Sequence, residues 1–253
     1  MVPGLSNLNF FNFLVSVVSE FISRREIKHL TYNVVYRQIL FTGFEALSII
    51  TLSAVAVGAV IIIQGNSVLS NFSQSPMYYN ILVAIIPREM GALLTALIVI
   101  ARSGTAISTE LGNMNINNET LAIYSFGISP VAYLAVPRVL GMTISVVSLS
   151  IYFNVAAFTS SWFVSFLTDA IIPSQFLFDL FSALTITDLM MGLIKSGLFG
   201  FFGGVIACYH GFKVQSAITE VPQRTIKTVV NSVSSLVLLD ILVTALFYLY
   251  LYD

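Results

Sequence analysis

Charged side chains are scarce in this sequence. Asp, Glu, Lys and Arg together make up 9% of the 253 residues, whereas hydrophobic residues make up 57% and the mean hydropathy is +0.92. A soluble domain carries about 25% charged residues, so there are too few here to cover a surface that faces water. The formal net charge of −1 leaves no basic excess to displace counterions from phosphates, which argues against a nucleic-acid partner. The composition predicts an integral membrane protein.

Cysteine and histidine are nearly absent as well. Cys208 is the one cysteine, which excludes a disulfide framework and a cysteine-rich metal site, and a small packing residue is the ordinary role of such a side chain. His29 and His210 are the two histidines and lie far apart in the sequence. We therefore expect neither a metal centre nor a Ser-His-Asp triad, and we expect no catalytic residue in this chain.

Long apolar runs dominate what remains. A membrane-spanning helix needs about 20 mainly apolar residues. Stretches of that length predict a single all-α transmembrane domain over residues 1–253, with spans at about 41–64, 77–101, 139–167, 189–209 and 229–252.

The N-terminal segment, residues 1–40, is predicted to hold a helix that lies in the membrane interface. Within residues 9–23, polar side chains recur at steps of three and four positions, and aromatic and aliphatic side chains fill the rest. This pattern is typical of an amphipathic helix, with Arg24, Arg25 and Lys28 placed toward anionic head groups. A helix that packs on the bundle would give the same pattern, so both alternatives stay open.

The basic residues predict the orientation. Of the 11 Lys and Arg residues, all but two lie on one side of the predicted spans, and the connections 64–76 and 168–188 on the other side hold none. Cytoplasmic loops carry such an excess of Lys and Arg. We therefore expect a cytoplasmic N-terminus and an external C-terminus.

Ionisable residues interrupt several of the predicted spans: Arg88 and Glu89 in the second, Lys195 in the fourth and Asp240 in the fifth. Such groups cost a few kcal/mol in the membrane and usually face a partner or a cavity. These four could only fix the helix register, or they could line a polar cavity for a charged head group. We favour the cavity, because apolar side chains would have been cheaper for stability. Pro87 beside them predicts a kink or local unwinding.

The fourth span also carries a small residue at every fourth position, at Gly192, Ser196, Gly200 and Gly204. Such a stripe lets two helix backbones approach closely. Packing within one chain is the favoured interpretation, and a seam between two copies is the alternative.

The connection 102–138 is predicted to be cytoplasmic and too short for a soluble enzyme domain. A helix from about Asn115 to Phe126 is expected to lie along the membrane face, where it would suit a docking partner. No Walker-type sequence is present, because GLIKSG at 192–197 lacks the required glycine spacing. Any ATPase activity must therefore come from another chain.

Several of these segments follow one another as a signature: Arg88–Gly91, Leu93–Leu97, Arg102–Ile107, Glu110–Met114, Pro130, Tyr133–Leu134, Val136–Arg138, Leu193–Ser196 and the stretch from Arg224 to Leu246. Together they resemble the MlaE/YrbE permeases, the membrane subunits of MCE-type ABC lipid transporters. The resemblance runs from about residue 20 to the end of the chain. Ala92, Thr120 and Ser129 depart from the family pattern, and the last two bear on the choice of partner.

The resemblance implies an interfacial helix followed by five spans, with the coupling helix between spans two and three. It also implies a homodimer in the bacterial inner membrane with a periplasmic C-terminus. Two copies of an ABC ATPase would bind ATP and Mg on the cytoplasmic side, an MCE-domain oligomer would sit on the periplasmic side, and phospholipid or a related lipid would be the substrate. Coupling to the ATPase would fall to residues in the segment 102–138, namely Arg102, Glu110, Gly112, Met114 and Glu119.

Two other functions remain as alternatives. A proton-coupled secondary transporter could use Glu89 or Asp240 as the titrating group, but the inverted repeats usual in that class are not evident. An intramembrane lipid-modifying enzyme could use Ser103, Glu110 or Ser196, but these residues match no catalytic spacing. The favoured function is a non-catalytic permease that exchanges lipid with a periplasmic partner, in support of outer-membrane lipid asymmetry or lipid supply.

Overall fold

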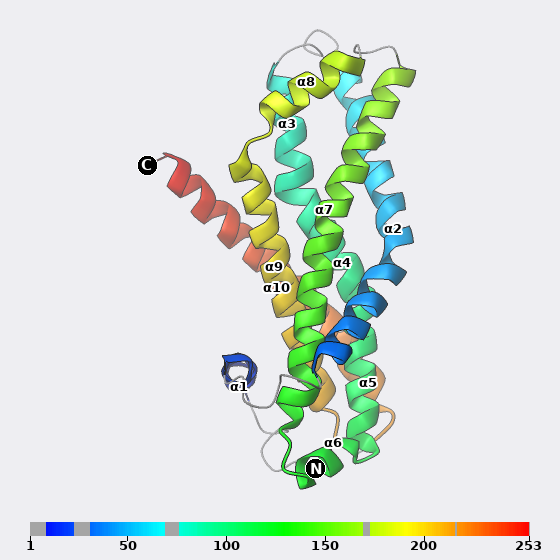
Figure 1. Cartoon of the computed structure of the whole chain (residues 1–253), viewed down its shortest axis with the longest axis vertical. Helices are drawn as coiled ribbons and strands as arrows, with labels where there is room; N and C mark the ends of the chain where they lie inside the picture. The colour runs from blue at the N-terminus through cyan, green and yellow to red at the C-terminus, as the bar shows by residue number, and fades with distance from the viewer. Residues whose placement is uncertain (1–8, 23–30, 69–75, 169–172, 216, 253) are drawn as a thin grey trace.

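The computed structural model describes residues 9–22, 31–68, 76–168, 173–215 and 217–252. Every regular element within these ranges is a helix, and the helices form an elongated bundle (Figure 1). Five stretches are long and apolar enough to cross a membrane: Val34–Gly65, Tyr79–Ile116, Val131–Leu167, Ile186–Phe212 and Glu220–Leu249. The prediction of an all-α membrane protein with five spans is confirmed.

The spans are assembled from α-helices and from π-helical turns, which are labelled η. The elements in chain order are α1 (Phe10–Ile22), α2 (Thr31–Val68), α3 (Pro76–Ile85), η1 (Ile86–Met90), α4 (Gly91–Val99), η2 (Ile100–Gly104), α5 (Thr105–Ile116), α6 (Glu119–Ser125), η3 (Val131–Ala135), α7 (Val136–Leu167), α8 (Pro173–Ala183), α9 (Ile186–Phe212) and α10 (Glu220–Tyr252).

The first span begins earlier than the sequence indicated. Residues 31–40 belong to α2, so the assignment of all of residues 1–40 to an interfacial helix was wrong. The separate N-terminal helix is α1, and Arg24, Arg25 and Lys28 lie outside the described residues.

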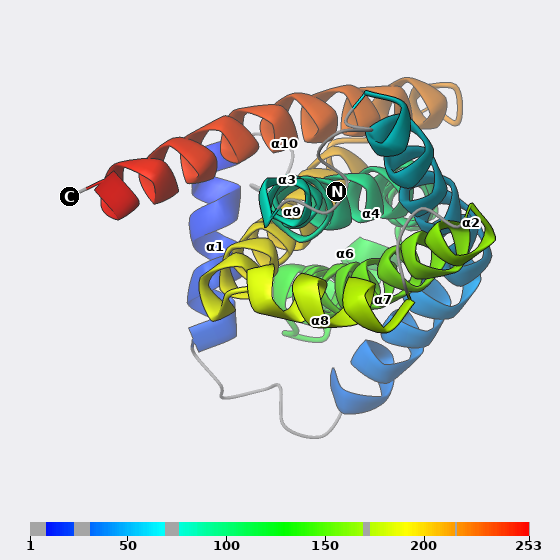
Figure 2. The same cartoon turned by 90° about the horizontal axis from the view of Figure 1, so that it is seen from above.

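The helix α1 packs on the bundle along one edge. Phe13 and Val17 are buried, and the Phe13 ring lies 5.7 Å from the Tyr209 ring and 6.0 Å from the Phe212 ring, both on α9. Phe11 and Ile22 are 71% exposed. Figure 2 shows α1 running across the end of α9 rather than along it. One edge of α1 therefore packs on the bundle, and its opposite apolar side is free to enter a membrane interface.

The second span continues well beyond Ala101, and this corrects the assignment of residues 102–116 to a connection. The helix runs on through η2 and α5 to Ile116, because Ile107 and Leu111 are buried where α5 packs against α9 and α10. Asn118, two residues after the end of this helix, adopts a left-handed backbone with φ 60° and precedes the next helix. The following helix α6 covers Glu119–Ser125, shorter than the predicted 115–126.

One further helix, α8, was not predicted. It lies in the connection between α7 and α9, at the end of the bundle opposite α6 (Figure 1). Its Phe176 and Leu180 are buried, and the Phe176 ring lies 5.7 Å from the Tyr79 ring on α3. These contacts hold α8 across the ends of the spans.

The core is built around α7 and α9. α7 packs against α2 and α9, and α9 packs against α4, α5, α7 and α10. α10 lies along one edge of the bundle in Figure 2, with most of its side chains exposed. In Figure 1 its C-terminal part diverges from the other helices.

Candidate functional site

A buried ammonium group joins three of the spans. Lys195 on α9 is fully buried, and its Nζ lies 2.6 Å from Glu89 Oε2 on η1 and 2.7 Å from Asp240 Oδ1 on α10. Lys195 Nζ also donates a hydrogen bond to Thr244 Oγ1 at 2.7 Å. Lys195 thus donates hydrogen bonds to Glu89 and Thr244, whereas Asp240 is held by charge alone, because its Oδ1 accepts no hydrogen bond. We call Glu89, Lys195, Asp240 and Thr244 the Lys195 cluster.

The π-helical turn η1 places Glu89 in this cluster. Pro87 lacks a backbone donor, and the Gly91 N–H bonds to the Ile86 carbonyl rather than to the Pro87 carbonyl. The sequence predicted a kink or local unwinding beside Pro87, and the structure has a π-helical turn there, within one continuous span. A Cβ at Gly192 on α9 would collide with the Pro87 carbonyl oxygen. The missing side chain at Gly192 is what lets α9 approach the widened turn.

Arg88 pairs with a residue outside the four intramembrane charges that the sequence singled out. Its Nε lies 2.7 Å from Asp188 Oδ1, and Asp188 is 1% exposed at the first turn of α9. The other carboxylate oxygen of Asp188 accepts hydrogen bonds from the Thr185 backbone N–H at 3.1 Å and the Thr185 hydroxyl at 2.8 Å. Arg88 and Asp188 thus form a second ion pair, separate from the Lys195 cluster.

Sequence reasoning missed Asp188 and Thr244. Asp188 was assigned to an external connection, but Thr185-x-x-Asp188 is a capping-box pattern that marks a helix start. Thr244 lies four residues after Asp240, which places the two on one helix face. Both signals were present in the sequence.

The small-residue stripe on α9 packs inside the chain. A Cβ at Gly200 would lie 2.7 Å from Thr143 Cα, and one at Gly204 would lie 3.1 Å from Val139 Cα, both on α7. Ser196 is buried, and its hydroxyl donates to the Leu193 carbonyl at 2.9 Å. Together with Gly192 against η1, the stripe serves the intramolecular packing that was favoured.

Two of the predicted coupling residues form ion pairs between helices. Arg102 pairs with Glu45 on α2, and its guanidinium lies 5.8 Å from the centre of the Phe41 ring. Glu110 Oε1 lies 2.8 Å from Nη2 of Arg138, a mostly buried residue on α7. Both residues therefore tie the α6 end of the second span to its neighbours.

The remaining predicted coupling residues lie around the start of α6. Gly112 is buried, and a Cβ there would lie 3.0 Å from Val214 Cγ2. Met114 is half-buried, and Glu119 is exposed at the first position of α6.

The short helix α6 is anchored to the bundle by a polar link and ends in exposed aromatic residues. Thr120 is buried, and its hydroxyl donates to Asn115 Oδ1 at 2.6 Å, while Asn115 Nδ2 donates to the Phe212 carbonyl at the end of α9 at 3.2 Å. Thr120 therefore has a structural contact where the family pattern differs. Tyr124 is 47% exposed and Phe126 is 80% exposed beyond it.

Comparisons with known proteins agree with this architecture. The family model described as "Permease MlaE" matches residues 35–246. A "Probable ABC transporter permease protein" of Rickettsia felis is 29% identical over 216 residues, which cover 85% of this chain and 83% of the relative. The "Intermembrane phospholipid transport system permease protein MlaE" of Haemophilus influenzae is 25% identical over 218 residues, which cover 86% and 84%. Because the family match spans most of the sequence and all five membrane helices, this chain belongs to the MlaE permease family.

Proposed function

We propose that this chain is the membrane-spanning subunit of an ATP-driven transporter that moves phospholipid between two membranes. Its family membership supports this, as do the names of its relatives, which include an intermembrane phospholipid transport permease. ATP and Mg would be bound by a separate ATPase subunit. This chain would form the membrane pathway for the lipid and would undergo the conformational change that moves it.

The single observation that carries the proposal is the Lys195 cluster. One ammonium group is shared between carboxylates from two other helices, and all of them lie within membrane-spanning segments. An ion network at that depth is costly to keep, and it marks transport pathways and moving elements in membrane proteins. Lys195 is fully buried, whereas the Glu89 side chain is 33% exposed. Glu89 is therefore the member of the cluster that a lipid head group can approach.

The two ends of the bundle are proposed to meet different partners. The α6 end carries Arg102, Arg138, Lys213, Arg224 and Lys227, which favours the cytoplasmic side for that end. The exposed aromatic residues at the end of α6 would there contact the ATPase, and Arg102 and Glu110 would pass the motion on to α2 and α7. The α8 end would face the periplasm and an MCE-domain oligomer, in the inner membrane of a bacterium.

A second copy of the chain is proposed to cover α10. Leu238, Ile241 and Leu242 on this helix are all more than half exposed. A homodimer through α10 would place the two Lys195 clusters on either side of a shared cavity.

The proposal is tested by reconstitution with an ABC ATPase subunit from the same organism. We expect phospholipid transfer from the proteoliposomes to an acceptor to require ATP hydrolysis, and Glu89→Gln to slow it while the complex still assembles. Glu20→Gln on α1, a carboxylate outside both the Lys195 cluster and the predicted coupling residues, should leave assembly and transfer intact and serves as a matched control for Glu89. Transfer that follows a proton gradient and ignores ATP would contradict the proposal, as would a chain that never purifies with an ATPase.

A further inference from the structure

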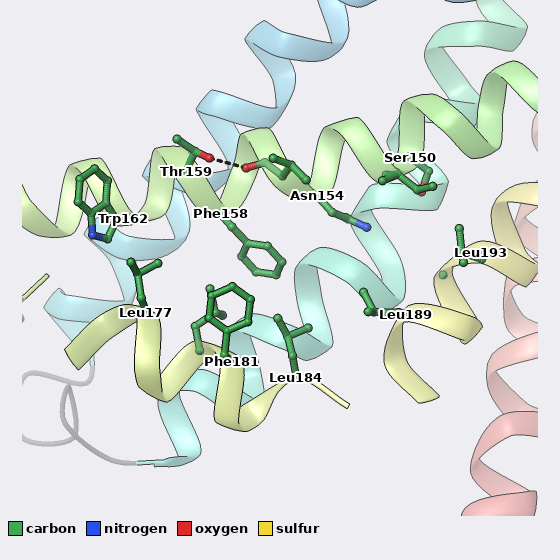
Figure 3. A pocket seen from close by; sticks show the side chains of 14 residues that line it. Ser150, Asn154, Phe158, Thr159, Trp162, Leu177, Phe181, Leu184, Leu189 and Leu193 are labelled. Atoms are coloured by element: carbon green, nitrogen blue, oxygen red, sulfur yellow. Dashed lines mark hydrogen bonds between the residues drawn. The ribbon is translucent and has the colours of Figure 1, made fainter. Parts of the chain in front are cut away.

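A pocket of about 650 Å³ lies between α7, α8 and α9, apart from the Lys195 cluster. Figure 3 shows Phe158 and Trp162 of α7, Leu177 and Phe181 of α8, and Leu189 of α9 around it. The pocket is within the range of about 300–1,000 Å³ that ligand sites occupy. Most of its lining side chains are apolar, and the polar exceptions are Ser150, Asn154 and Thr159. Such a lining favours an apolar guest.

The pocket opens on the lateral surface of the bundle. Val155, Phe181 and Leu189 line it and are also 61%, 71% and 45% exposed. α7 and α9 are membrane-spanning segments, so acyl chains surround this opening when the protein is in a bilayer. The pocket therefore faces a reservoir of one particular apolar ligand.

The inner wall of the pocket adjoins the helices of the Lys195 cluster. Gly192 lines the pocket and also faces the Pro87 carbonyl of η1. Asn154 lines it as well, and its side chain lies so close to Gly91 that a Cβ there would collide with it. The Asn154 Oδ1 is buried without a hydrogen-bond partner. The inner wall of the apolar pocket thus lies beside η1, the turn that carries Glu89.

We propose that this pocket binds one acyl chain of a membrane phospholipid, taken laterally from the leaflet beside α8. An acyl chain fits the size of the pocket and its apolar lining. It could enter through the lateral opening in the membrane-spanning part and would reach the wall beside η1. The inference is independent of the proposed transport, because lipid binding can be measured with neither an ATPase nor ATP. A failure of one proposal is therefore distinct from a failure of the other.

Trp162 provides a direct measurement, because it is the single tryptophan in the chain and it lines the pocket. We would titrate phosphatidylcholine with brominated acyl chains into the purified full-length chain in detergent and follow tryptophan emission, which bromine quenches on contact. We expect a saturable loss of emission that unlabelled phosphatidylcholine reverses. Val155→Phe, which narrows the opening, should shift the titration to higher lipid concentration.

A variant with its tryptophan at a different position on α7 is the matched control. The double variant Trp162→Phe, Ile144→Trp places the one tryptophan on α7 at a position that is 43% exposed and outside the pocket. There we expect shallow quenching that does not saturate. Equal curves for the two reporters would overturn the proposal, and so would emission from Trp162 that unlabelled lipid fails to restore. Loss of quenching as the protein concentration rises would mean that a second copy occupies the pocket, which would also overturn it. The competition in the unmodified chain decides the matter even if Val155→Phe does not fold.

Discussion

The helices α9 and α10 both cross the membrane and both carry a charge in the Lys195 cluster, yet they differ in how they are held. α9 is packed on several sides, with Gly192, Gly200 and Gly204 in close backbone contact with other helices. α10 exposes most of its side chains and rests mainly on α9 and α5. Packed cores resist continuous deformation, so α9 is the fixed centre of the fold. α10 can change position at much lower cost, and Asp240 and Thr244 are what tie its outer part to that centre.

The largest loss of stability is expected from Lys195→Met, which removes the positive charge from α9. Glu89 and Asp240 would then be left as uncompensated carboxylates within the membrane, and breaking a buried ion pair in this way costs about 3–5 kcal/mol. Thermal unfolding in detergent would show a large loss of stability. Lys213→Met, at the end of α9 where Nζ lies 4.7 Å from the centre of the Tyr209 ring, should cost about 0.5–1 kcal/mol. Equal losses in the two variants would contradict the central role of Lys195.

Two glycine substitutions in α9 should change the stability of the fold by smaller amounts. One should destabilise the fold and the other should stabilise it. In Gly200→Ala the new Cβ would lie 2.7 Å from the Thr143 backbone, so overpacking should destabilise the fold by about 1–3 kcal/mol. In Gly197→Ala the nearest atom would be 3.8 Å away, and the higher helix propensity of alanine should stabilise the fold by up to about 1 kcal/mol. Unfolding temperatures of the two variants in one detergent would compare them. A stabilising Gly200→Ala would mean that α7 and α9 are less tightly packed.

Asp240→Asn tests how α10 is held against α9. Lys195 would keep its hydrogen bonds to Glu89 and Thr244 and lose one ion pair, so the loss of stability should be smaller than that of Lys195→Met. Because α10 has few other contacts near this point, we also expect faster proteolysis or hydrogen exchange in its C-terminal half than in α9. Unchanged exchange in α10 would show that Asp240 does not hold this helix in place.

The smallest effect on the fold is expected from Leu238→Ala. This side chain is 69% exposed on α10, so the change should alter the stability of the single chain by no more than about 0.5 kcal/mol. If α10 forms the dimer contact, self-association measured by sedimentation in detergent should nevertheless weaken. Leu236→Ala is the matched control, because Leu236 is 1% exposed and its loss should destabilise the chain itself.

The sequence was sufficient to predict the spans and most of the charged cluster. Hydropathy identifies spans because any segment inside the membrane must be apolar over its whole length. Lys195, Glu89 and Asp240 stand out because each is a charge in such a segment. The partner of Arg88 was not predicted, since Asp188 lies at the edge of the apolar run and enters the membrane-spanning helix through its capping box.

Other features left no clear trace in composition. The continuation of the second span to Ile116 depends on the burial of Ile107 and Leu111 against neighbouring helices, which is a tertiary effect. The π-helical turns are shifts of hydrogen-bond register by one residue, and hydropathy does not record register. α8 was missed because its eleven residues are too few for a span, and Phe176 and Leu180 alone are buried among its residues 175–183. The roles predicted for the coupling residues remain predictions, with Arg102 and Glu110 now placed in ion pairs between helices.

The continuous second span has a mechanical consequence. The stretch Tyr79–Ile116 contains 38 residues, which corresponds to a rod of about 57 Å, nearly twice the thickness of the hydrocarbon core. A rod of that length acts as a lever, so a tilt of about 5° at one end displaces the other by about 5 Å. The turn η1, with Glu89 upon it, lies within this rod. A force applied near α6 would therefore displace the Glu89 carboxylate within the Lys195 cluster.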